Sequence, residues 1–148
     1  MTGEEARRRF SEARVARLAT ADGSGRPHLV PIVFAIACDT VVSAVDHKPK
    51  RSTSLKRLAN VAENPSVSIL VDEYSEDWDR LWWARADGTA RVLDPGTVEA
   101  DRAVELLAGR YPQYQTRRPG GQVLAVDVRR WSGWSAVPQG DAVRSPPR

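Results

Sequence analysis

The sequence contains few of the residues that most often build disulfides and metal sites. Its 148 residues include one cysteine and two histidines, so an internal disulfide and a cysteine-based metal site are excluded. No apolar run approaches the roughly 20 residues that a membrane-spanning helix needs. Residues 1–5 contain two acids and no apolar stretch, unlike a signal peptide. We therefore expect a cytoplasmic protein with no metal site and no membrane partner.

Motifs of the common catalytic and nucleotide-binding sites are also missing. The chain contains no G-x-S-x-G, H-E-x-x-H, Walker A or G-x-G-x-x-G pattern. His28 has no evident partner, which favours a structural or surface role, so no catalytic residue is named. The net charge is only +3 and the basic residues are interleaved with acids, so we expect no nucleic-acid partner.

Lysine is scarce too, but its distribution is uneven. All three lysines lie in residues 46–57, a segment that we call the basic turn and that has no acid after Asp46. It joins a strand-like pattern to a helix-like pattern, and helix starts bind anions through their N–H groups and dipole. The segment predicts a phosphate or polycarboxylate site, although a solvated loop with an ordinary N-cap gives the same pattern. Its basic residues are Lys48, Lys50, Arg51, Lys56 and Arg57.

Periodicity predicts a mainly β domain over residues 1–137, with flanking helices and a disordered tail over 138–148. Helices are expected over 3–12, 53–62 and 95–110, and a polar loop over 111–121. About six antiparallel strands are expected to form a small barrel. The segments 81–85 and 88–93 predict either a hairpin or one long strand bulged at Gly88. Pro31 indicates an edge, a bulge or an open backbone. The other expected strands are 14–21, 28–36, 40–45, 66–72 and 122–129, with a short one at 131–136.

Three of the five tryptophans lie in residues 77–85. Because Trp82 and Trp83 are adjacent on a predicted strand, they must face opposite sides of the sheet. One of them can be in the core, which leaves the other to face a partner subunit or a planar ligand. So many aromatic residues in a small barrel favour a dimer interface.

Several of these segments together resemble a known family. The stretches 14–20, 25–34 and 64–68 resemble the split-barrel superfamily that binds FMN or the deazaflavin coenzyme F-420, which is similar to pyridoxamine 5′-phosphate oxidase. Within it, Asp46–Lys50 together with Asp77–Trp78 and Leu81–Trp83 resembles the actinobacterial branch of F-420-dependent oxidoreductases. The resemblance implies a six-stranded antiparallel split barrel that forms a homodimer, with two cofactor sites at the interface.

The resemblance also implies where the cofactor binds and what it does. The ring is expected against two neighbouring strands and the phosphate in the basic turn. The reaction is expected to be hydride transfer to or from a small organic substrate, which requires no acid–base residue of the protein. The cofactor-binding residues implied are Val30, Pro31, Ile32, Val33, Ala44, Val45, Asp46, Lys48, Lys50, Arg51, Ser54, Lys56, Arg57 and Trp78, and the role of His47 stays open.

Two alternatives remain beside an F-420-dependent enzyme. FMN could serve as the cofactor, in a redox role or in a reaction like that of pyridoxamine-phosphate oxidase. The protein could also bind a flavin, F-420 or a tetrapyrrole without turnover. F-420 carries a phosphodiester and an acidic glutamate tail, and a wide basic strip suits it better than it suits FMN.

Overall fold

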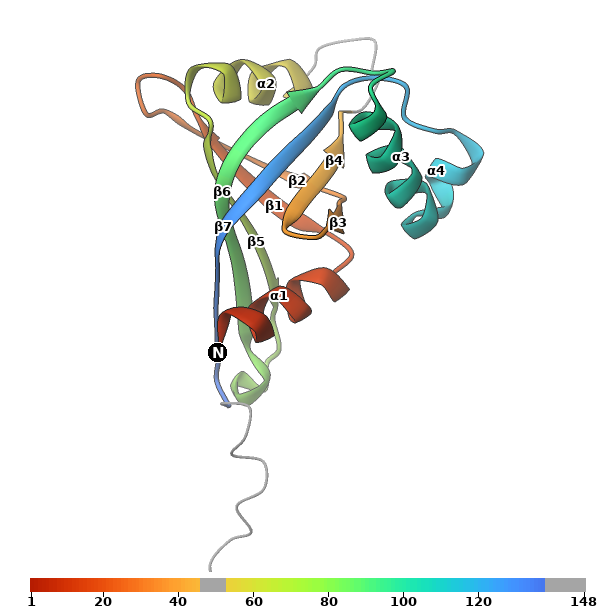
Figure 1. The fold of residues 1–148 in the computed structure, drawn as a ribbon. Coiled ribbons are helices and arrows are strands. Elements are labelled where there is room, and N and C mark those ends of the chain that lie inside the picture. The colour runs from red at the N-terminus through yellow and green to blue at the C-terminus, as the bar shows by residue number, and fades with distance from the viewer. Residues whose placement is uncertain (46–52, 138–148) are drawn as a thin grey trace, which may run out of the picture.

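The computed structural model describes residues 1–45 and 53–137, with only the backbone of residues 53–55 (Figure 1). Among these residues, no helix combines the length and the apolar character needed to cross a membrane. The predicted tail at 138–148 and residues 46–52 of the basic turn lie outside the described residues. The elements are α1 (Gly3–Glu12), β1 (Ala16–Ala21), β2 (Pro27–Ile32), β3 (Ala35–Ala37), β4 (Thr40–Ala44), α2 (Thr53–Glu63), β5 (Ser66–Glu73), the short 3-10 helix η1 (Trp78–Arg80), β6 (Trp82–Leu93), α3 (Val98–Arg110), α4 (Pro112–Thr116) and β7 (Val123–Ser135).

The described strands form one antiparallel sheet of seven, not six, in the order β2-β1-β5-β6-β7-β4-β3. The extra strand arises because the predicted strand 28–36 is interrupted at Val33 and Phe34. Before the interruption β2 pairs with β1, and after it β3 pairs with β4. The chain therefore passes from one edge of the sheet to the other through two residues. The edge position predicted from Pro31 is confirmed, since β2 pairs on one side only.

Strands β6 and β7 form a long ribbon with one bulge. Residues 82–93 are a single strand, so the hairpin alternative was wrong and the long strand is confirmed, but the bulge lies in the partner strand β7, opposite Gly88, and not at Gly88 itself. Asp87 pairs with Arg130 but Gly88 pairs with Val128, which makes Arg129 of β7 the extra residue. A Cβ on Gly88 would lie 3.0 Å from the Cα of Val128, so a glycine is needed opposite the bulge.

The core has two parts. On the inner face of the sheet, Phe10 of α1 packs edge-on against Phe34 and Trp131, with ring centroids 5.0 and 5.2 Å apart. Helix α3 covers β3, β4 and the start of β7 and buries Leu107 against them. Helix α4 lies where a polar loop was predicted over 111–121. It is only five residues long and begins with a proline at its first turn, too short for periodicity to detect.

The opposite face of β2, β1, β5, β6 and β7, here called the outer face, presents apolar side chains to solvent. Along each strand the residues that alternate with the buried ones point there. Leu29 is 67% exposed, Trp134 is 47% exposed, and Leu70 lies between them on β5. The helices α1 and α2 contribute Phe10 and Val61 to the inner core, so they pack on the other side.

Candidate functional site

The two segments expected under the cofactor ring meet at one place. The Ser43 hydroxyl donates to the Val33 carbonyl at 2.8 Å. This hydrogen bond joins the C-terminal end of β4 to the residue that follows β2. One residue beyond Ala44, the Val45 N–H donates to the Gln122 carbonyl at 3.0 Å. The ends of β2 and β4 therefore lie side by side immediately before the basic turn, and we call this place the strand junction.

Most side chains expected to contact the ring serve the core. Ile32 and Ala44 are buried, and Val30 and Val33 pack against the two core clusters. Pro31 is exposed and Val45 is half-buried, so Pro31 is the most accessible of these side chains. Of the remaining predicted residues, Asp46, Lys48, Lys50 and Arg51 lie outside the described residues, as does His47. The side chain of Ser54 is likewise not described.

Helix α2 begins where the basic turn ends. Helices α1 and α3 have side-chain N-caps, Thr2 and Thr97, and acidic residues in their first turns. The first turn of α2 has no acid. Lys56 is exposed near it and Arg57 is half-buried. The pKa of Asp22 in the β1–β2 turn is lowered, first by a hydrogen bond from the Arg26 N–H, then by one from the Ser24 N–H, and to a smaller extent by the charge of Lys56.

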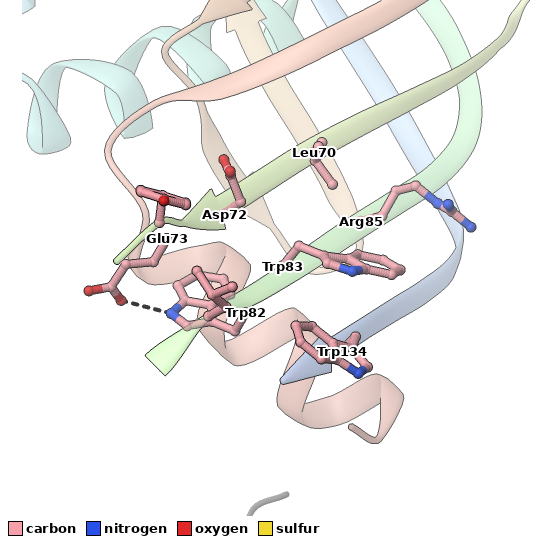
Figure 2. Close-up of a pocket in the computed structure, with 9 residues that line it drawn as sticks. Leu70, Asp72, Glu73, Trp82, Trp83, Arg85 and Trp134 are labelled. Atoms are coloured by element: carbon pink, nitrogen blue, oxygen red, sulfur yellow. Dashed lines mark hydrogen bonds between the residues drawn. The ribbon is translucent and has the colours of Figure 1, made fainter. Parts of the chain in front are cut away.

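An aromatic cavity of about 350 Å³ opens on the outer face at the far end of the ribbon (Figure 2). We call it the tryptophan pocket. Trp83 and Trp134, which pair across β6 and β7, share this face, whereas Trp82 packs against the inner core. The residues that line it are Leu70, Asp72, Glu73, Tyr74, Leu81, Trp82, Trp83, Arg85 and Trp134.

The charged groups of the tryptophan pocket already have partners. The Trp82 indole donates to Glu73 at 2.8 Å, as the dashed line in Figure 2 shows. Asp72 pairs with Arg17 at 3.3 Å. The guanidinium of Arg85 donates to Asp87 and lies 5.5 Å from the ring centre of Trp83. The surface left for a ligand or a partner is therefore mainly aromatic and aliphatic.

Trp78 does not join the other predicted site residues. It is 67% exposed in η1, at the opposite end of the molecule from α2 (Figure 1). The eight residues of β5 separate the two ends, a length of about 25 Å. Within one copy of the chain, Trp78 therefore lies at the end of the sheet opposite Lys56 and Arg57. The sequence had raised the question of a ligand or partner contact for the tryptophans, Trp134 included, but missed Leu70, because only strand register brings Leu70 to the same pocket.

Comparison with known proteins agrees with this fold. The family model described as pyridoxamine 5′-phosphate oxidase matches residues 2–135. The chain belongs to this family. Among curated proteins, no match was found.

Solved structures share the split-barrel fold at low identity. An FAD-binding protein from Mesorhizobium loti is 22% identical, with 90% of this chain and 94% of that chain covered and a TM-score of 0.68. A conserved hypothetical protein from Mycobacterium tuberculosis is 21% identical, with 92% and 86% covered and a TM-score of 0.70. The haem storage protein HutZ from Vibrio cholerae is 16% identical, with 91% and 95% covered and a TM-score of 0.68. The same fold thus occurs in proteins described as binding flavin and in one described as storing haem.

Proposed function

We propose that this protein is an oxidoreductase that uses coenzyme F-420 to transfer a hydride to or from a small organic substrate. The observation that carries the proposal is the strand junction. It places the segments expected beneath the ring, around Val33 and Ala44, directly before the basic turn and the start of α2. A planar ring and a phosphate group on one ligand need this combination of an apolar strand edge and an anion site.

The described residues fit an anionic cofactor. The first turn of α2 has no carboxylate to compete for its N–H groups, and Lys56 adds a positive charge nearby. The wide spacing of the basic residues, from Lys48 to Arg57, favours the phosphodiester and acidic tail of F-420 over the single phosphate of FMN. When bound, the deazaflavin supplies the hydride chemistry. The contribution of the protein is to hold the anionic end, support the ring and exclude water.

We further propose that two copies of the chain form a homodimer and complete the site together. Trp78 and the tryptophan pocket lie at the end of the molecule opposite α2, so a second copy is needed to bring them to a cofactor held at the basic turn. The exposed Leu70 and Trp134 give the end of the outer face around the tryptophan pocket an apolar surface suited to such an interface.

The test is a titration of the purified full chain with F-420 and, separately, with FMN, followed by tryptophan fluorescence. F-420 should quench the fluorescence, and Lys50→Ala combined with Arg51→Ala should weaken its binding about 10- to 100-fold, since charge-assisted hydrogen bonds are lost. Arg102→Ala, at an exposed arginine of α3, is the matched control and should bind as the wild type does. Light scattering after gel filtration should give the mass of a dimer.

Each alternative has its own result. Binding of FMN but not F-420 would replace the cofactor and keep the oxidoreductase class. A haem absorption band with no flavin or deazaflavin binding would favour the non-catalytic role. Haem needs an axial ligand, and His28, the one histidine among the described residues, has its Nδ1 buried. Equal binding by the double variant and the wild type would refute the basic turn as the anion site.

A further inference from the structure

A second cavity opens on the outer face beside the bulge of β7. Its volume is about 380 Å³, and we call it the arginine cleft. Small side chains such as Ala19 and Ala21 leave it open, and Gly88, the residue opposite the bulge, also lines it. Its polar wall consists of Ser66, Ser68, Asp87 and Arg129.

The bulge determines the position of Arg129. The strand pairing skips this residue, so its side chain is not constrained to alternate with its neighbours. The chain maintains the bulge at a cost, because glycine in a strand is unfavourable and only glycine fits opposite the distorted backbone. Bulges that redirect a side chain in this way are frequent beside functional sites. Here the redirected residue is a cation that lines a cavity.

The charges around the cleft leave Arg129 available. The carboxylate of Asp87 accepts from the Ser68 hydroxyl at 2.5 Å and from Arg85 Nε at 2.9 Å, so it is already neutralised. Within residues 1–45 and 53–137, neither Arg129 nor its neighbour Arg130 has a carboxylate within 4.0 Å, and both are exposed. The cleft therefore has one unneutralised guanidinium on its wall and a second beside it.

We infer that the arginine cleft binds an oxyanion, the phosphate or carboxylate group of a small molecule. A guanidinium presents parallel N–H donors that match two oxygens of such a group, and the exposed Ser66 hydroxyl supplies a further donor. The site is separate from the basic turn. Ser66 follows the last residues of α2, and the eleven residues of that helix place its start about 16 Å away.

The experiment isolates the cleft by working in the Lys50→Ala, Arg51→Ala background, where the basic turn is disabled. Inorganic pyrophosphate is the probe, measured by calorimetric titration at low salt. Adding Arg129→Ala should weaken binding about 10- to 100-fold, because two charge-assisted hydrogen bonds are lost. Arg129→Lys keeps the charge but loses the paired donors and should give an intermediate affinity. Arg102→Ala should change nothing.

The folded state should tolerate these changes, since Arg129 is exposed and outside the ladder of strand pairs. Melting without pyrophosphate should confirm this. Equal binding with and without Arg129→Ala would overturn the inference, as would an equal loss from Arg102→Ala. Pyrophosphate binding that disappears entirely in the double background would also overturn it. F-420 titration of Arg129→Ala alone should match the wild type, so failure of this site and failure of the cofactor site are distinguishable.

Discussion

The hydroxyl of Tyr111 connects three parts of the fold, and its removal is a direct test of how the sheet is held together. The tyrosine follows α3 and is 7% exposed. Its oxygen accepts from the Phe34 N–H at 3.1 Å and from Arg110 Nε at 3.2 Å. It lies 3.0 Å from the carbonyl oxygens of Arg14 and Phe34, to which it can donate. The Tyr111→Phe variant removes only this oxygen.

The expected loss follows from the groups left behind. Phe34 is fully buried, so its N–H would lose its partner without access to water. Such a buried unpaired donor costs about 1–3 kcal/mol, and the weakened contact to Arg110 adds to it. We expect a total of about 2–4 kcal/mol, a substantial part of the roughly 5–15 kcal/mol that holds a domain folded. The melting temperature should fall by about 5–15 °C.

Thermal and urea denaturation, followed by circular dichroism, measure this loss. Tyr74→Phe is the matched control, because that hydroxyl is exposed and contacts Glu76 at 3.3 Å on the surface. Its effect should stay within about 0.5 kcal/mol. If Tyr111→Phe has the same melting temperature as Tyr74→Phe and the wild type, the Tyr111 hydroxyl does not stabilise the interruption between β2 and β3.

Four further substitutions test the backbone and the ion pairs. Cys38 has a φ of 55° in the β3–β4 turn, a left-handed conformation that asparagine adopts more readily than cysteine. Cys38→Asn should therefore raise the free energy of unfolding, measured by urea denaturation, by about 0.5–1 kcal/mol. A decrease would contradict this. Gly88→Ala should destabilise by about 2 kcal/mol or more because its Cβ meets the backbone of β7, whereas Gly109→Ala, with open space around it, should stabilise slightly. The Arg91 guanidinium lowers the pKa of Asp127, chiefly through a hydrogen bond. That stabilisation is present above the unfolded pKa of 3.8 and is lost as the pH falls through the lower pKa of the folded state. The difference in free energy of unfolding between the wild type and Arg91→Gln should therefore shrink below about pH 4. A difference that stays constant with pH would refute this.

The sequence predicted elements whose burial is periodic and missed those created by distant contacts. The helix over residues 3–12 matches α1, because its apolar residues and acidic first turn are local signals. Residues 28–36, by contrast, are almost uniformly apolar and show no break. The interruption at Val33 and Phe34 depends on distant residues: the Tyr111 hydroxyl bonds the backbone of Phe34, and the Ser43 hydroxyl donates to the Val33 carbonyl. No local pattern contains that information.

The candidate site was predictable in composition but not in arrangement. The basic turn and the tryptophans could be read from the sequence, yet the sharing of one face by Trp83 and Trp134 could not. Their pairing depends on the bulge at Arg129. If Arg129 paired with Asp87 in a regular ladder, Gly133 would lie opposite Trp83 and Trp134 would face the other side of the sheet. The omission of Arg129 from the ladder thus decides which aromatic side chains form the tryptophan pocket.

The two edges of the open sheet are poor templates for a further strand, which bears on aggregation. Pro27 and Pro31 lie in register on β2, four residues apart, so their nitrogens point to the same side, away from β1. Of the three backbone nitrogens on that side, only that of Leu29 carries a hydrogen. The other edge, β3, is three residues long. An incoming chain would find too few donors on one edge and too short a strand on the other, so apolar strands can form this open sheet without recruiting another copy edge to edge.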